Sequence, residues 1–289
     1  MWLTALVASG LEIHIGLSSD YKRLKQCNGI NILKLMIPKA HSLYIDKKLS
    51  PLQLMDCYLK MIAAMNHILG AVLHVHLFAR DMAHSMPYST HRMIFQQPLY
   101  GISVLVKGKI ALEPLSNTTG SDALKDNKQP DAAVVERLRK TGAIVFGTCN
   151  LSKFTSARSL IPPEGWSHLG RETINLYNLN KMTMGSSLGS AVAVAANLAL
   201  VSLGTETLGS VISPASCNMV VGFKPTYNWT STKGILPLIL SLDMVTLNQT
   251  MCLPCRLACS PAQCKIPILS WKSSMTANRS SWPWTFQKR

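Results

Sequence analysis

Two glycine- and serine-rich segments bracket an apolar run in Gly185–Ser216, and no other stretch constrains the fold as strongly. The first segment, 185–190, holds two glycines and three serines, so its backbone N–H groups can gather around a bound group. The alanine-rich residues 191–197 predict a helix that ends in a left-handed turn at its final asparagine. Residues 198–203 predict a buried strand that runs into the second segment, 204–210. This order of loop, helix, strand and loop is typical of an α/β protein.

On their own, the glycine-rich segments leave three interpretations open. They can be an ordinary connection without a ligand, a phosphate-binding loop, or a dinucleotide-binding loop. A phosphate-binding loop ends in Gly-Lys-Ser or Gly-Lys-Thr, and a dinucleotide-binding loop reads Gly-x-Gly-x-x-Gly. Neither pattern occurs in 185–216, so the residues argue against both nucleotide interpretations.

A third element lies well upstream, where Gly101–Lys107 predicts a strand that ends in a lysine. The second glycine-rich segment reads Gly-Thr-Glu-Thr-Leu-Gly-Ser-Val-Ile-Ser-Pro-Ala over Gly204–Ala215. Together these elements resemble the amidase signature family, whose turn has the form G-T-[DE]-x-x-G-S-[IV]-x-x-P-[AS]. The resemblance implies an α/β amidase-signature fold, with a mixed β-sheet core covered by helices. It also implies hydrolysis of an amide by a Ser-Ser-Lys triad.

The resemblance gives three side chains a role. Ser210 corresponds to the nucleophile, Ser186 to the bridging serine that the family holds in a cis peptide, and Lys107 to the base. The backbone N–H groups of the family's oxyanion hole correspond to those of Thr207, Leu208, Gly209 and Ser210. Such a triad needs no histidine, because burial lowers the pKa of a lysine and keeps its amine neutral. The neutral amine can then draw a proton from the bridging serine while that serine draws one from the nucleophile.

Three positions depart from the family pattern. Leu208 stands where relatives commonly have glycine or aspartate, and Leu188 replaces a glycine or serine. The added bulk predicts a narrower acyl pocket. Gly108 follows the lysine where the family usually has aspartate, so a carboxylate that could orient the lysine is missing. Slower turnover is the expected consequence.

Shorter family segments occur in the family's order, at Asn117–Ser121, Gly147–Ser152, Val221–Thr226 and Gly234–Pro237. We therefore predict an unassigned segment over 1–39, a partial amidase domain over 40–247 and a divergent tail over 248–289. The tail contains no acidic residue and four cysteines. Family domains are longer, so we expect a truncated domain that is incomplete at its C-terminal side and leaves a sheet edge uncovered.

Local patterns predict two helices of the domain. Ser50 and Pro51 are an N-cap followed by a proline at the first helical position, and an apolar stripe at helical spacing predicts a core face. The stripe consists of Met55, Tyr58, Ile62, Met65 and Leu69. Asp131 is the predicted cap of a second helix, which Gly142 ends before a strand over 143–146. The segment 81–98 predicts an irregular connection.

We expect no metal and no cofactor. His74 and His76 alternate with apolar residues in a predicted strand, and without an acidic or cysteine partner nearby we expect them to face solvent. The tail cysteines have a spacing that fits no common metal-binding motif. They are Cys252, Cys255, Cys259 and Cys264.

Charge and composition limit the possible partners. The net charge is +15 and the isoelectric point about 9.6, but the basic residues are scattered and form no nucleic-acid-binding motif, so we expect no nucleic acid. No apolar run is long enough to span a membrane. The eight cysteines are compatible with reduced thiols and favour the cytoplasm. The compartment and the oligomeric state stay open, and a small-molecule amide is the expected substrate.

We therefore predict an amidase that hydrolyses a carboxylic amide through an acyl-enzyme. The first alternative is a catalytically inactive, truncated remnant, and the second is a basic nucleic-acid-binding protein. The family includes one component of glutamyl-tRNA amidotransferase, but the Gly-Thr-Glu-Thr subtype resembles the stand-alone amidases of plants and bacteria.

Overall fold

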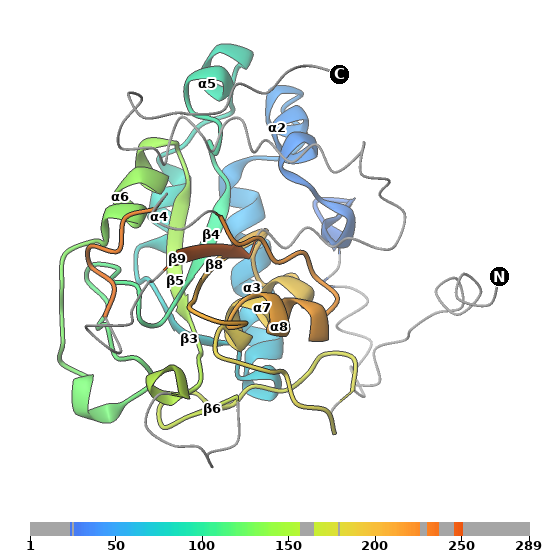
Figure 1. Ribbon diagram of the computed structural model, residues 1–289. Helices are drawn as coiled ribbons and strands as arrows, with labels where there is room; N and C mark the ends of the chain where they lie inside the picture. The colour runs from blue at the N-terminus through green and yellow to red at the C-terminus, as the bar shows by residue number, and fades with distance from the viewer. Residues whose placement is uncertain are drawn as a thin grey trace, which may run out of the picture.

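The computed structural model describes residues 24, 26–156, 165–178, 180–225, 230–236 and 246–250. A five-stranded sheet with the order β3-β5-β4-β8-β9 forms the centre of the molecule (Figure 1). Its strands are β3 (Val72–Val75), β4 (Ser103–Lys107), β5 (Ile144–Cys149), β8 (Val201–Glu206) and β9 (Thr246–Thr250). Strand β4 pairs in parallel with β5 and β8, whereas β3 and β9 pair antiparallel to their neighbours. The sheet is mixed, which confirms the predicted fold class.

The three central strands are buried along their whole length. Parallel strands need cover on both faces of the sheet, and two helices provide it. Helix α6 (Ala133–Lys140) connects β4 to β5, and α7 (Leu188–Ala195) precedes β8. Because such crossovers are right-handed and β5 and β8 flank β4, the two helices lie on opposite faces of the sheet (Figure 1). Strand β4 therefore lies in the middle of the core.

Helix α3 (Pro51–Leu69) confirms the prediction made from its N-cap and apolar stripe. The Ser50 hydroxyl accepts from the Gln53 N–H at 3.1 Å, and the Gln53 side chain accepts from the Ser50 N–H at 2.9 Å. This reciprocal pair satisfies two backbone donors that a helix start leaves open. Gly70 ends the helix with φ at +57°. All five residues of the predicted stripe are buried.

The helix and strand predicted between the two glycine-rich segments are also confirmed. Helix α7 covers Leu188–Ala195, and Asn197 adopts the predicted left-handed conformation with φ at +57°. The carbonyl of Ala193 accepts from the N–H of Leu198 at 2.7 Å, and β8 begins soon afterwards. The alanine-rich helix can pack closely on the sheet because its side chains are small.

The remaining elements are short. They are the β-strands β1 (Gln26–Cys27), β2 (Ile30–Asn31), β6 (Trp166–Ser167) and β7 (Arg171–Glu172), the 3-10 helices η1 (Ile32–Lys34), η2 (Asp122–Leu124) and η3 (Lys153–Ser156), and the α-helices α2 (Ile37–Ile45), α4 (Ala79–His84), α5 (His91–Gln96) and α8 (Ile212–Cys217). Helices α4 and α5 lie where the sequence predicts an irregular connection, so that prediction is wrong. Thr90 starts α5, because its hydroxyl accepts from the Met93 N–H.

The predicted orientation of the two histidines after α3 is wrong for His76, which is buried. The N–H of His76 donates to the carbonyl of Phe146 at 2.8 Å, so pairing with β5 continues past the end of β3. The imidazole Nδ1 accepts from the Phe78 N–H at 3.1 Å. His74 is half-buried and lies 3.3 Å from the Thr148 hydroxyl. The alternation in sequence did not show which face the neighbouring strand and helices cover.

Asp131 does not cap α6, which corrects a second local prediction. The N-cap residue is Ala132, and no side chain caps the helix there. The Asp131 carboxylate instead accepts from the Glu113 N–H at 2.9 Å and from Arg139 Nε at 2.7 Å. Its negative charge thus forms an ion pair with Arg139. Gly142 does end the helix as predicted, with φ at +84°.

Cys27 and Cys57 form a disulfide, contrary to the expectation of reduced thiols. The bridge joins the β1–β2 hairpin to α3, and Cys27 belongs to the hydrophobic core together with Ile32, Leu35 and Ile37. Packed structure therefore begins before residue 40. Cys149 and Cys217 are free thiols, and the tail cysteines lie outside the described residues. Within the described part of the chain, no helix combines the length and hydropathy that crossing a membrane requires.

Candidate active site

The side chain of Lys107 lies at the carboxyl end of β4 and is fully buried. Parallel pairing places the carboxyl ends of β4 and β8 at the same edge of the sheet. The segment before α7 reaches this edge as well, because the N–H of Ser187 donates to the carbonyl of Ser210 at 2.9 Å. The structure thus brings together the lysine and the two glycine-serine segments that the sequence singles out.

The Lys107 amine contacts three oxygens. Its Nζ lies 2.7 Å from the Ser186 hydroxyl, 2.9 Å from the Ser187 hydroxyl and 3.2 Å from the Thr205 carbonyl. Both serines are buried. Burial, and to a lesser extent the nearby charge of Lys109, holds the pKa of Lys107 well below its usual value, while Glu206 opposes this shift.

The hydrogen bonds around Ser187 determine how a neutral Lys107 is oriented. The Ser187 hydroxyl donates to the Thr205 carbonyl at 3.1 Å and accepts from the Thr205 N–H at 3.3 Å, so it can only accept from Lys107. The Thr205 carbonyl can only accept as well. A neutral amine has two N–H groups and one lone pair, and the two groups are directed at these acceptors. The lone pair is left for the Ser186 hydroxyl, which can therefore donate its proton to Lys107.

Backbone contacts hold Ser186 in place. The Gly185–Ser186 peptide bond is cis, as the family resemblance implies. The Ser186 carbonyl accepts from the Ser152 N–H at 3.2 Å. The Ser152 hydroxyl lies where a side chain at position 185 would project, so glycine lets the two segments approach without displacing it.

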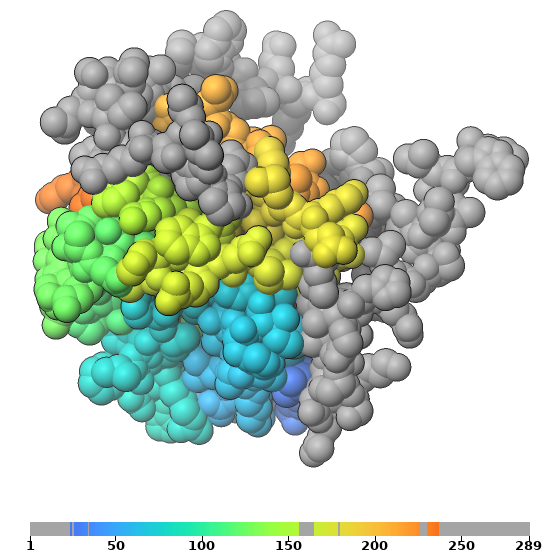
Figure 2. All heavy atoms as spheres, turned by 90° about the horizontal axis from the view of Figure 1, so that it is seen from below, coloured from blue at the N-terminus to red at the C-terminus, as the bar shows by residue number. Residues whose placement is uncertain are grey.

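Asn150 anchors the chain that leads to Ser186. Its amide Nδ2 lies 3.1 Å from the carbonyls of Gly70 and Arg171 and 2.9 Å from the Thr173 hydroxyl, and these three acceptors share its two N–H groups. The backbone carbonyl of Asn150 accepts from the Gly189 N–H at the start of α7 at 3.2 Å. In Figure 2 the chain from residue 165 onward, coloured yellow, forms a band across the face seen from below. The side chain of this buried residue thus connects the band to the turn after α3, whereas its backbone makes the bond to α7.

Ser210 follows β8 and is half-buried. Within the described part of the chain, its hydroxyl makes no hydrogen bond with Ser186, so the two hydroxyls of the expected relay are not joined. The backbone bond from Ser187 N–H to the Ser210 carbonyl nevertheless keeps both segments adjacent. Catalytic hydrogen bonds often shorten only when a substrate is bound.

The segment 207–210, which corresponds to the oxyanion loop, directly follows β8. Leu208 is 91% exposed, and the narrowing of the acyl pocket by its side chain stays a prediction. Leu188, the other bulky departure, is fully buried in α7. Gly209 has φ at +76°, a conformation that favours glycine. The N–H of Gly209 also contributes to lowering the pKa of the Glu206 carboxyl group.

Glu206 ends β8 and is almost fully buried. Burial alone would raise the pKa of this carboxyl group. Hydrogen bonds from the backbone of Ile212 and Val211, together with the contact to Lys224, outweigh burial and lower the pKa below its usual value. Glu206 is therefore ionised at neutral pH.

Sequence reasoning missed Ser187, Lys109 and the pairing of Glu206 with Lys224. Ser187 directly follows the bridging serine, and Lys224 lies in the Val-Gly-Phe-Lys-Pro-Thr segment, so both were quoted without a role. Two lysines separated by one residue, Lys107 and Lys109, were a signal that one could perturb the other.

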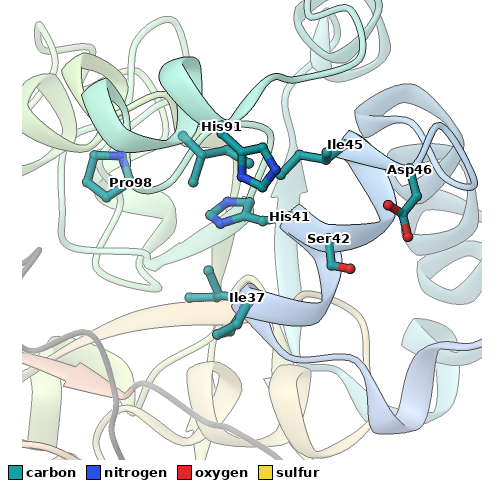
Figure 3. Close-up of a pocket in the computed structure, with 9 residues that line it drawn as sticks. Ile37, His41, Ser42, Ile45, Asp46, His91 and Pro98 are labelled. Carbon is teal, nitrogen blue, oxygen red and sulfur yellow. The ribbon is translucent and has the colours of Figure 1, made fainter.

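A cavity of about 440 Å³ lies away from these residues, between α2 and α5 (Figure 3). Ile37 and His41 line it from α2, and His91 lines it from α5. Burial lowers the pKa of His41 to about 4. Pro98 lines the cavity and precedes β4, whereas Lys107 ends that strand, so the cavity and Lys107 lie at opposite ends of it.

The chain is similar in sequence and structure to known amidases. The Amidase family profile matches residues 53–248. A probable amidase of Arabidopsis thaliana is 37% identical over 248 residues, which cover 83% of this chain and 47% of that protein. A component of the glutamyl-tRNA(Gln) amidotransferase of Symbiobacterium thermophilum is 34% identical over 218 residues, covering 73% and 43%. The peptide amidase of Stenotrophomonas maltophilia superposes with a TM-score of 0.67 at 37% identity, covering 71% and 42%.

The family profile matches more than half of the chain, and the chain therefore belongs to the amidase family. It spans less than half the length of each of these three relatives.

Proposed function

We propose that this protein hydrolyses a carboxylic amide through an acyl-enzyme on Ser210, with Ser186 and Lys107 as the proton relay. The observation that carries the proposal is the buried Lys107 amine, 2.7 Å from the Ser186 hydroxyl. The partners of Ser187 leave the lone pair of the neutral amine for the Ser186 proton.

In the first half-reaction Lys107 takes the proton of Ser186 while Ser186 takes that of Ser210. The Ser210 oxygen bonds to the carbonyl carbon of the amide, and the negative charge develops on the carbonyl oxygen. Backbone N–H groups of 207–210 would stabilise that charge, and one such donor is typically worth about 2.7–4 kcal/mol in the transition state. The relay then runs backwards and protonates the leaving nitrogen, and the C–N bond breaks.

In the second half-reaction a water molecule replaces the departed amine. The relay accepts a proton from this water as its oxygen attacks the acyl carbon, and returns a proton to Ser210 as the ester bond breaks. The products are the carboxylic acid and the amine. A small-molecule amide is the substrate class we propose, and the similarity to a peptide amidase and to an amidotransferase component leaves its acyl group and its amine open.

The test is intact-mass analysis after treatment with a fluorophosphonate, a reagent that phosphonylates activated serines. We expect one adduct on the folded protein, no adduct on Ser210→Ala, and slow labelling of Lys107→Ala. Ser216→Ala is the matched control, because this serine is exposed on α8 and should label like the unmodified chain. Release of ammonia from a panel of primary amides then measures turnover.

The same experiment separates the proposal from the inactive alternative. A folded chain that gives no adduct, and releases no ammonia, would contradict the amidase proposal and favour the inactive remnant. Circular dichroism and a cooperative thermal transition establish that the sample is folded.

A further inference from the structure

A buried carboxylate holds the chain on both sides of Ser210. Glu206 Oε2 accepts from the N–H of Val211 at 2.7 Å and from that of Ile212 at 3.0 Å. These N–H groups directly follow the proposed nucleophile, whereas Glu206 itself precedes the loop 207–210. A single side chain therefore spans the loop at its base.

Lys224 completes this arrangement from a separate segment, after α8. Its Nζ lies 3.2 Å from Glu206 Oε1 and donates to the Thr207 carbonyl at 2.9 Å. The side chain of Lys224 is 35% exposed, while that of Glu206 is 4% exposed. The Lys224 side chain thus extends from the surface to a buried carboxylate. Its ammonium group also binds the first carbonyl of the loop.

The bond to the Thr207 carbonyl determines the direction of a neighbouring N–H group. A trans peptide unit is planar, and its C=O and the following N–H point in opposite directions. When Lys224 holds the Thr207 carbonyl, the N–H of Leu208 must therefore point away from Lys224. Without this bond the unit could rotate about the single bonds on either side of it, because within the described residues no other donor bonds to the Thr207 carbonyl. Lys224 thereby selects one orientation of a proposed oxyanion donor.

We propose that Lys224 is a positioning residue, which orients the Leu208 N–H towards the developing oxyanion through its contacts with the Thr207 carbonyl and Glu206. The inference rests on the proposed function. It assigns the lysine of the Val-Gly-Phe-Lys-Pro-Thr segment a part in the reaction, although this side chain need not touch the substrate.

The test compares fluorophosphonate labelling kinetics of the full chain with those of Lys224→Met and Lys224→Arg. Misplacement of a catalytic group by about 1 Å can cost about 100-fold in rate, so we expect kinact of Lys224→Met to fall by about that factor. The reagent concentration that gives half of the maximal labelling rate, KI, should change little, because Lys224 is not expected to touch the reagent. Arginine can donate to both oxygens, so Lys224→Arg should recover most of the rate. Lys233→Met is the control, because Lys233 is exposed and its side chain lies outside this arrangement.

A double-mutant cycle with Glu206→Gln adds a second readout. If the two side chains act together, the Glu206→Gln/Lys224→Met double variant should label only slightly more slowly than the slower single variant. Should Lys224→Met fail to fold, Lys224→Gln replaces it, because glutamine keeps an N–H donor without the charge and is expected to lose less rate.

Three results would overturn the inference. They are an unchanged kinact in a folded Lys224→Met or Lys224→Gln variant, a loss that Lys224→Arg does not recover, and additive losses in the cycle. Failure of the proposed function looks different, because then the unmodified chain itself gives no adduct on Ser210.

Discussion

At the scale of single residues, the proposed reaction requires Lys107 to be uncharged. Lys107 is buried, and its neighbours include a second lysine, Lys109, that is also buried. A charge at Lys109 disfavours a charge at Lys107, and Glu206 only partly compensates. The Ser187 hydroxyl can accept a hydrogen bond from the neutral amine, and the Ser186 hydroxyl can donate one to its lone pair. A lysine can serve as a base at neutral pH only when its surroundings lower its pKa in this way.

The pH dependence of labelling should report the Lys107 pKa. Only the neutral amine can accept the Ser186 proton, so the rate should rise with pH through this pKa and level off below the ordinary lysine value of 10.5. Lys109→Met removes a nearby charge, so the pKa of Lys107 rises and the rising part of the profile moves to higher pH. Labelling rates measured across a pH series would show the shift.

A control variant and the unchanged profile of Lys109→Met distinguish the two causes of the lowered Lys107 pKa. Lys233→Met, at an exposed position, should leave the profile where it is. A profile that stays in place after Lys109→Met would mean that burial alone lowers the Lys107 pKa.

At the scale of elements, local signals and tertiary contacts define different parts of the fold. The capping box and the apolar stripe of α3 lie within one helix and were predictable from sequence, and so was the left-handed Asn197 after α7. The contacts of Asp131 and His76 were not, because their partners come from other elements. The disulfide between Cys27 and Cys57 joins two elements that are separated by 30 residues.

Reduction of this disulfide should destabilise the N-terminal part of the chain. A cross-link limits the unfolded ensemble, and for a loop of 30 residues the expected contribution is about 3–4 kcal/mol. Urea unfolding of Cys57→Ser, or of the chain with a thiol reductant, should show a loss of that size. Cys217→Ser is the control, since Cys217 is an exposed free thiol. Equal stability with and without reductant would contradict the expectation.

At the scale of the whole molecule, the candidate site depends on contacts between distant segments. The Asn150 side chain links the end of β5 to the turn after α3 and to the chain around Arg171, while its backbone carbonyl bonds to the start of α7. Its amide group is fully used, and none of these partners is close in sequence. The position of Ser186 therefore depends on a side chain that does not touch the reacting groups.

Asn150→Ala should affect stability and labelling together. The substitution leaves several buried polar groups without partners, and we expect a loss of about 2–4 kcal/mol in unfolding free energy. Because the chain before Ser186 loosens, fluorophosphonate labelling should slow as well. Chemical unfolding and labelling of the same sample measure both effects. Asn180→Ala, at an exposed position, should change neither, and labelling of Asn150→Ala at the original rate would show that Ser186 does not depend on this anchor.

The sequence by itself determined the family and the fold class and suggested the three residues of the proposed relay, because those features are carried by short motifs and by local periodicity. Only the tertiary structure decided which groups surround them. The order of strands brings Lys107 to Ser187 and Thr205, and the chain after α8 returns to place Lys224 against Glu206. Hydrogen-bond partners of this kind follow from how elements pack in space, and neither propensity nor spacing along the chain specifies that packing.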